Sequence, residues 1–111
     1  MDTLNYTFSD KDALASACMG FIIRGGLFLA VNKAYALGES MNIVVQLWDE
    51  TEPLVFMAKV IWLTPIHEGD QWPQGVGIQF GEEDSKWVRA RIETYVEEAF
   101  SVKPDKMAFF A

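Results

Sequence analysis

The sequence predicts an α+β domain that is mainly β, arranged as a small Greek-key barrel with a helix packed on it. Two observations lead to this prediction: apolar residues alternate with polar ones in several short segments, and the period changes to helical spacing near the C-terminus. The 111 residues, half of them hydrophobic, suffice for one packed core. We therefore expect a single domain over residues 1–103, followed by a short tail over 104–111.

Three segments are typical of β-strands, and a fourth predicts a strand pair around a glycine turn. Residues 41–48 alternate apolar and polar side chains, the pattern of a half-buried strand, whereas residues 54–64 are apolar on both sides. The polar letters DETEP between them predict a tight hairpin connection. Residues 76–80 alternate again and predict a second hairpin. In residues 20–31, Gly-Gly is expected to separate the end of one strand from the start of another.

One segment near the C-terminus has the spacing of an amphipathic helix. Over residues 84–100, apolar residues recur on one face: Val88, Ile92, Tyr95, Val96 and Ala99. Asp84 or Ser85 is a suitable cap for its start. A shorter helical turn is expected over residues 9–17, where a capping Ser or Asp precedes the alanines.

Charge and composition narrow the class of partner and the compartment. The chain has a net charge of −7 and its basic residues are scattered singly, which disfavours nucleic-acid binding and favours a protein partner. Its apolar runs fall well short of the roughly 20 residues that a membrane helix needs, so we expect no direct membrane insertion. The N-terminus has no basic and apolar leader, and Cys18 is the single cysteine. These two features predict a cytoplasmic protein whose thiol is reduced and buried.

No set of residues has the spacing of a catalytic, cofactor-binding or metal-binding site, so we expect a protein that is not an enzyme and needs no cofactor. His67, the one histidine, lies in a polar loop with no second histidine and no cysteine nearby in sequence. The acidic runs at 49–52 and 82–84 lack calcium-loop spacing and are typical of solvated turns. The letters GVG at 75–77 precede a strand rather than a helix, so they do not form a dinucleotide-binding turn.

Several motifs occur in an order that resembles a known family. They are GGLFLAVNKAY, AKVIWLTP, GVGIQF and RIETYV, within about residues 20 to 100. On these motifs the chain resembles the PilZ domain family, and in particular the short, single-domain PilZ proteins of type IV pilus assembly. The resemblance implies a six-stranded antiparallel barrel with a C-terminal helix. It also implies a non-enzymatic adaptor in pilus assembly and twitching motility, whose partners are the pilus-extension ATPase and an EAL-domain regulator that binds cyclic di-GMP.

Most PilZ domains bind cyclic di-GMP through two motifs, and this chain lacks the polar residues of both. The first is Arg-x-x-x-Arg ahead of the barrel, but the first arginine here is Arg24 and the lone base upstream is Lys11. Paired arginines matter because their planar donors match phosphates and guanine edges. The second motif is Asp/Asn-x-Ser-x-x-Gly. Aligned on Gly26, its two polar positions hold Phe21 and Ile23.

The resemblance therefore implies an adaptor that does not bind cyclic di-GMP itself. A receptor domain for cyclic di-GMP is the main alternative, and an unrelated small β-barrel or an enzyme is a third. The discriminating feature between the first two is the missing arginine pair.

Phe21, Ile23 and Trp62 are the first candidates for protein contact. Phe21 and Ile23 either fill the core or belong to an exposed apolar patch that docks a protein. Strict alternation places Trp62 on the side of Phe56 and Val60, near the end of its strand. There it is either one core aromatic among many or an anchor of the type enriched at interfaces.

Further aromatic candidates lie in loops and at the end of the chain. Trp72 lies in a polar loop and has no periodic reason to be buried, whereas Trp48 at a strand end is ambiguous. Phe109 and Phe110 follow the helix and its proline. This aromatic tail either folds back onto the barrel or forms a short recognition segment.

Overall fold

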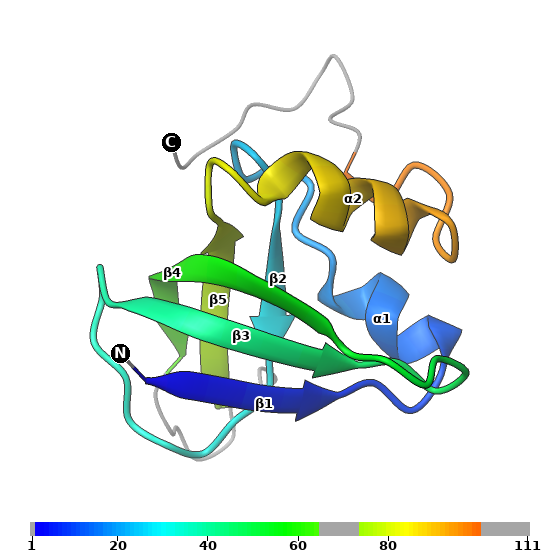
Figure 1. Cartoon of the computed structure of the whole chain (residues 1–111). Helices are drawn as coiled ribbons and strands as arrows, with labels where there is room; N and C mark the ends of the chain where they lie inside the picture. Colours follow the sequence, from blue (N-terminus) through cyan, green and yellow to red (C-terminus); the bar gives the residue numbers. More distant parts are fainter. Residues whose placement is uncertain (1, 65–73, 101–111) are drawn as a thin grey trace.

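A curved five-stranded sheet and two helices make up the part of the chain that the computed structural model describes, residues 2–64 and 74–100 (Figure 1). In chain order the elements are β1 (Thr3–Thr7), α1 (Lys11–Ala17), β2 (Gly26–Leu29), β3 (Ser40–Gln46), β4 (Leu54–Thr64), β5 (Gly75–Phe80) and α2 (Ser85–Glu93). The strand order β1-β3-β4-β5-β2 leaves β1 and β2 at the two edges. The sheet curls into a half barrel, so the mainly β prediction is confirmed.

The two hairpins that the alternating segments predict are both present. β3 pairs antiparallel with β4, and β4 pairs antiparallel with β5. β5 also pairs antiparallel with β2, which begins at Gly26 after the predicted glycine turn. Each of these pairs brings alternate apolar side chains to the same concave face.

The expectation of six antiparallel strands is wrong for the described residues. The sheet has five strands and is mixed, because β1 runs parallel to β3, with Thr3 opposite Asn42 and Thr7 opposite Gln46. A parallel pair needs a long crossover connection, and here α1 and β2 lie within it. The alternation of Leu4 with its polar neighbours extends over too few residues to reveal either the strand or its direction.

The two predicted helices form, but the longer one ends early. α1 lies within the predicted 9–17 segment, and the Asp10 side chain caps it by accepting from the Ala13 backbone N–H at 2.8 Å. α2 spans nine residues rather than the whole of 84–100, and the chain continues as turns after Thr94. Asp84 precedes this helix without capping it, because its carboxylate accepts from the backbone N–H of Met57 at 2.9 Å and from the Trp87 indole.

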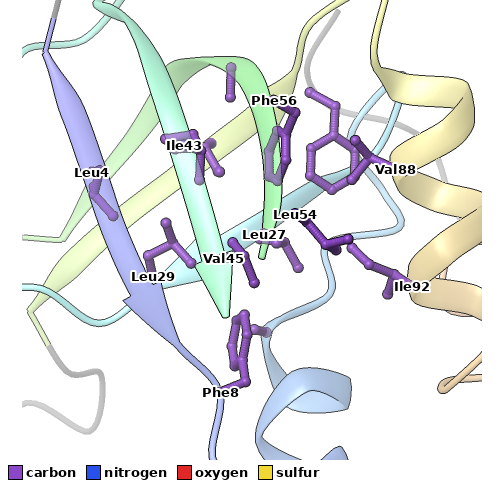
Figure 2. Packing of buried hydrophobic residues seen from close by; sticks show 14 of the residues in the cluster. Leu4, Phe8, Leu27, Leu29, Ile43, Val45, Leu54, Phe56, Val88 and Ile92 are labelled. Atoms are coloured by element: carbon purple, nitrogen blue, oxygen red, sulfur yellow. The ribbon is translucent and has the colours of Figure 1, made fainter. Parts of the chain in front are cut away.

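The hydrophobic core fills the concave side of the sheet and is closed by α2. Figure 2 shows Val88 and Ile92 pointing from this helix toward Leu54 and Phe56 of β4. Both helical residues are fully buried, as their predicted place on the apolar face requires. Burying a side chain of this size contributes roughly 1.5–3 kcal/mol, so this contact holds the helix on the sheet.

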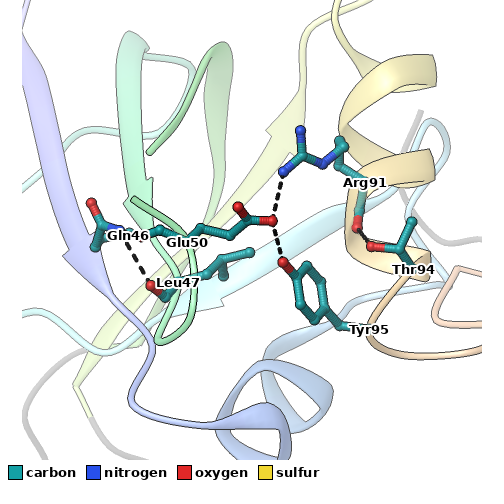
Figure 3. A network of polar contacts seen from close by, with 6 residues as sticks. All are labelled: Gln46, Leu47, Glu50, Arg91, Thr94 and Tyr95. Atoms are coloured by element: carbon teal, nitrogen blue, oxygen red, sulfur yellow. Dashed lines mark hydrogen bonds and ion pairs between the residues drawn. The ribbon is translucent and has the colours of Figure 1, made fainter. Parts of the chain in front are cut away.

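A polar cluster ties the β3–β4 connection to the end of α2 (Figure 3). The Glu50 carboxylate accepts from the Arg91 guanidinium at 2.9 Å and from the Tyr95 hydroxyl. The hydrogen bond that the Tyr95 hydroxyl donates to Glu50, more than burial, raises the pKa of Tyr95 to about 12. The Trp48 ring packs edge-on against Tyr95 with centroids 5.2 Å apart. The acidic run at 49–52 is thus a turn, and its Glu50 carboxylate links the β3–β4 connection to the end of α2.

Candidate functional site

An apolar groove of about 530 Å³ opens between the two edge strands of the sheet. β1, α1, β2 and the end of β4 all contribute to its walls. The side chains that matter for its shape are Tyr6, Ala13, Ala17, Phe21, Phe28 and Trp62. None of the residues that line the groove is charged. A concave apolar surface of this size at the edge of a fold is typical of a binding site.

Trp62 reaches the groove because β4 contains an irregularity just before it. The pairing of β4 with β5 shifts register between Val60 and Trp62. Val60 therefore stays in the core, whereas Trp62 is 43% exposed and its indole N–H donates to the Thr64 hydroxyl at 2.8 Å. Strict alternation, which places both residues on one side, is wrong at this position because a bulge reverses the parity of a strand.

Two glycines of β5 make room for the aromatic residues of the groove. A Cβ added at Gly77 would lie 2.8 Å from Trp62 Cβ and 3.3 Å from Met19 Sδ. A Cβ added at Gly75 would lie 2.6 Å from Phe28 Cζ. These aromatic side chains therefore cover a strip of bare backbone, which explains why β5 is buried on both faces although it alternates glycine with apolar residues.

A tight turn, not a strand, precedes β2 and decides which apolar residues are exposed. Only an isolated bridge between Cys18 and Leu27 links this segment to β2, so the expected strand end before the glycines is wrong. Arg24 and Gly25 both have left-handed backbone, with φ of 72° and 81°. This turn buries Ile22.

Phe21 and Ile23, the two candidate residues of this turn, do not share one surface. Phe21 is half-buried and lines the groove. Ile23 is 44% exposed and lies outside the groove lining. The structure therefore brings Phe21 and Trp62 together and leaves Ile23 apart.

Comparison with known protein families identifies the fold. The PilZ domain matches residues 3–98 of this chain, which is most of its length. The chain belongs to the PilZ domain family. No curated protein sequence matches it. PilZ domains are regulatory binding domains rather than enzymes, so in this PilZ domain a binding surface is the site of interest.

The PilZ motif positions occupy two different environments in this chain. Position 21 carries the phenylalanine of the groove and position 23 an exposed isoleucine. Gly26 lies directly against β5, where an added Cβ would collide with the Ile78 carbonyl oxygen. The glycine is thus explained by close packing of β2 on β5, and it carries no information about a ligand.

The thiol of Cys18 lines the groove but is not a reactive group. Burial, with a smaller effect of the Glu93 charge, raises the pKa of Cys18 to about 12. Its Sγ donates to the Leu14 carbonyl oxygen at 3.3 Å. Cys18 is half-buried and packs against the core, close to the expected role of a small hydrophobe.

Other predicted residues lie away from the groove or outside the described ranges. Trp48 is 36% exposed and packs on Tyr95 instead of lining the groove. Trp72, His67, Phe109 and Phe110 lie outside the described residues. Within residues 2–64 and 74–100, no group of three or more His, Cys, Asp or Glu side chains could hold a metal ion. No helix of this part of the chain is long and apolar enough to cross a membrane.

Sequence reasoning missed most of the groove residues. Tyr6, Met19 and Phe28 line it, yet they look like ordinary strand or loop residues in the sequence. One signal is visible in retrospect: Gly75 and Gly77 alternate in a strand, which indicates that bulky side chains from elsewhere lie over that strand.

Proposed function

We propose that this PilZ domain is a non-enzymatic, cytoplasmic adaptor in type IV pilus assembly and twitching motility that acts through protein contacts. The observation that carries the proposal is the apolar groove in which Phe21 and Trp62 lie together. Phe21 stands where the cyclic di-GMP motif of the family has a polar residue. An uncharged groove of about 530 Å³ suits apolar side chains of a protein better than a ligand with two phosphates.

The proposal assigns the groove to the pilus-extension ATPase. An EAL-domain regulator that binds cyclic di-GMP is the second proposed partner. Trp62 supports a protein interface because tryptophan is enriched among residues that dominate binding energy, and 43% of its surface is exposed. Trp62 packs against Gly77 of β5 and Phe28 packs against Gly75, so a strand of the sheet holds both side chains in place.

Direct binding of cyclic di-GMP is the competing function. Arg24 is the only arginine of the sequence before residue 89, and its Nε donates to the Phe80 carbonyl oxygen at 3.3 Å. One arginine bound to the backbone offers less to two phosphates than the pair that the family motif supplies. We expect no binding of cyclic di-GMP at micromolar concentrations in isothermal titration, and a low-micromolar dissociation constant would refute this part of the proposal.

The docking surface is tested by replacing Phe21 and Trp62 together with alanine. Because Trp62 is exposed and Phe21 is half-buried, the double variant should keep its thermal midpoint within a few degrees. Its affinity for the purified pilus-extension ATPase should fall by roughly 2 kcal/mol or more, as expected for interface anchors. Binding is measured by titration on the same preparations used for thermal unfolding.

Trp48→Ala is the matched control for this experiment. Trp48 is also an exposed tryptophan, 36% accessible, but it packs on Tyr95 and does not line the groove. Its loss should leave the affinity for the ATPase unchanged. Parent-like affinity in the stably folded double variant would remove the groove from the proposed interface.

A further inference from the structure

A second, smaller cavity of about 170 Å³ lies on the sheet surface away from the groove. Its lining is mixed: Arg24, Ser40, Lys59 and Gln79 are polar or basic, the others are Met57, Ala58, Phe80 and Gly81, and no acidic residue is among them. This contrasts with the chain as a whole, which has a net charge of −7. The cavity is therefore a local basic site in an acidic protein.

Strand register explains why these residues meet. Ser40 of β3 is opposite Lys59 of β4, Lys59 is opposite Gln79 of β5, and Gln79 is opposite Gly26 of β2. Residues aligned in this way form one row across a face of the sheet. Gly26 contributes no side chain to the row. Arg24 enters from the adjoining turn, where its left-handed backbone, φ 72°, places it beside the row.

The amide of Gln79 has a fixed orientation and an unsatisfied oxygen. Gln79 is 1% exposed, and its Nε2 donates to the Ile23 carbonyl oxygen at 2.8 Å. Because a carbonyl oxygen only accepts, the amide must present its NH₂ group to Ile23 and its Oε1 elsewhere. That Oε1 is buried, and no group of the described residues donates to it. A buried acceptor without a donor is costly, so this position favours a ligand that brings one.

Two cations line the same cavity as Gln79 and have no carboxylate partner in the described part of the chain. Arg24 is half-buried and held by its Nε contact to the Phe80 carbonyl oxygen. Lys59 is exposed and follows the strand register next to Gln79. Within the described ranges, the one ion pair of the structure joins Arg91 and Glu50 elsewhere. The cavity thus offers positive charge and a hydrogen-bond acceptor within one small space.

We propose that this cavity binds the free C-terminal end of a peptide chain. The α-carboxylate meets the charges of Lys59 and Arg24, while the N–H of the last peptide bond donates to Gln79 Oε1. Peptide ends combine an anion with a donor a few bonds away, which is the combination that these residues require. The volume of about 170 Å³ is below the roughly 300–1,000 Å³ of sites for whole small ligands, so it accommodates an end group. Inorganic phosphate at neutral pH also combines negative charge with one or two P–OH donors, so it is the competing occupant that the titration must distinguish from the peptide.

Nuclear magnetic resonance titration of the full chain with acetyl-alanyl-alanine tests the proposal. The peptide with a free carboxylate should shift the Gln79 side-chain NH₂ signals and the backbone amides of Lys59 and Arg24, with a dissociation constant of about 1–10 mM. The same peptide blocked as a C-terminal amide should bind at least about 10-fold more weakly, because it lacks the charge. Absence of shifts up to about 10 mM free-acid peptide, or equal binding of both peptides, would overturn the proposal.

Lys59→Gln and Lys86→Gln form a matched pair of variants. Both remove one exposed positive charge, but Lys86 lies on α2 and does not line the cavity. Lys59→Gln should weaken the free-acid peptide at least about 5-fold, and Lys86→Gln should leave it unchanged. Equal weakening in both variants would show a general charge effect and reject the site. Inorganic phosphate that binds as tightly as the peptide, with the same dependence on Lys59, would show a simple anion site instead.

The outcome is independent of the proposed adaptor function. The cavity shares no lining residue with the groove, so loss of ATPase binding in the groove variant leaves the peptide titration unaffected. A parallel titration with cyclic di-GMP tests the proposed adaptor function alone. The adaptor proposal predicts no binding of cyclic di-GMP, and that prediction does not depend on Lys59.

Discussion

At the scale of single residues, glycine and cysteine positions set the properties of the groove. Gly77 lets Trp62 and Met19 approach the backbone of β5, and the adjoining Gly75 does the same for Phe28. Cys18 contributes a thiol that burial keeps protonated. The two glycines therefore make room for the side chains of the groove, and burial keeps its one thiol in the unreactive, protonated form.

Gly77→Ala should disturb the groove and the stability of the domain together. The new methyl group would lie 2.8 Å from Trp62 Cβ, which a rotation of the indole cannot relieve. Overpacking of this kind costs about 1–3 kcal/mol, so the thermal midpoint should fall by several degrees. Asn5→Ala, at an exposed position of β1, is the control and should melt like the parent. An unchanged midpoint for Gly77→Ala would show that the strand and the tryptophan separate freely.

Cys18 should resist alkylation as long as the protein is folded. With a pKa raised from 9.0 to about 12, the folded protein holds about 1,000-fold less thiolate at pH 8 than an ordinary cysteine, and the thiolate is the reactive form. Iodoacetamide labelling, followed by mass spectrometry, should be slow in buffer and fast in concentrated urea. Equal labelling rates in the two solutions would contradict the burial of this thiol.

At the scale of elements, α2 is held on the sheet by a short apolar stripe and by polar contacts at both ends. Val88 and Ile92 enter the core, and Asp84 ties the start of the helix to β4 through the Met57 backbone N–H. This backbone hydrogen bond, followed by the one from Trp87, lowers the pKa of Asp84. At the other end, the contact between Glu50 and Arg91 joins the helix to the β3–β4 connection.

Ile92→Ala should destabilise the domain strongly, because it leaves a cavity between α2 and the sheet. Truncation of a buried isoleucine costs about 2–5 kcal/mol, which lowers the thermal midpoint by roughly 8 °C or more for a domain of this size. Glu93→Ala changes the adjacent exposed residue and should have little effect. Thermal unfolding followed by circular dichroism measures both. If Ile92→Ala melts like the parent, the helix is not docked as described.

At the scale of the whole molecule, the half barrel separates two surfaces of opposite character. The gap between the edge strands forms the apolar groove, whereas a row of residues across the sheet forms the basic cavity. Both surfaces involve the segment between α1 and β2, with Phe21 at the groove and Arg24 at the cavity. The two proposed binding surfaces therefore lie on different parts of one domain.

Folding of the whole chain should not depend on a metal ion. The described residues hold no cluster of three potential ligands, and the one histidine lies outside them. Excess EDTA should therefore leave the thermal midpoint unchanged within error, measured against an equal concentration of a non-chelating salt. A drop of many degrees would reveal a structural metal site.

The sequence by itself determined the elements that depend on local patterns. Alternation placed β3 and β5, an apolar run bounded by a proline placed β4, the helical period located the start of α2, and the motifs identified the PilZ domain. The resemblance also indicated that position 21 had become apolar. It did not reveal where that side chain points.

Only the tertiary structure decided which of these side chains meet. The register shift after Val60 left Trp62 exposed rather than in the core, and the turn before β2 placed Phe21 in the groove and Ile23 outside it. Pairing of distant strands likewise placed Lys59 beside Gln79. These outcomes depend on one-residue shifts and on contacts between remote segments, to which a local hydrophobic period is insensitive, because a single-residue slip moves every following side chain to the opposite face.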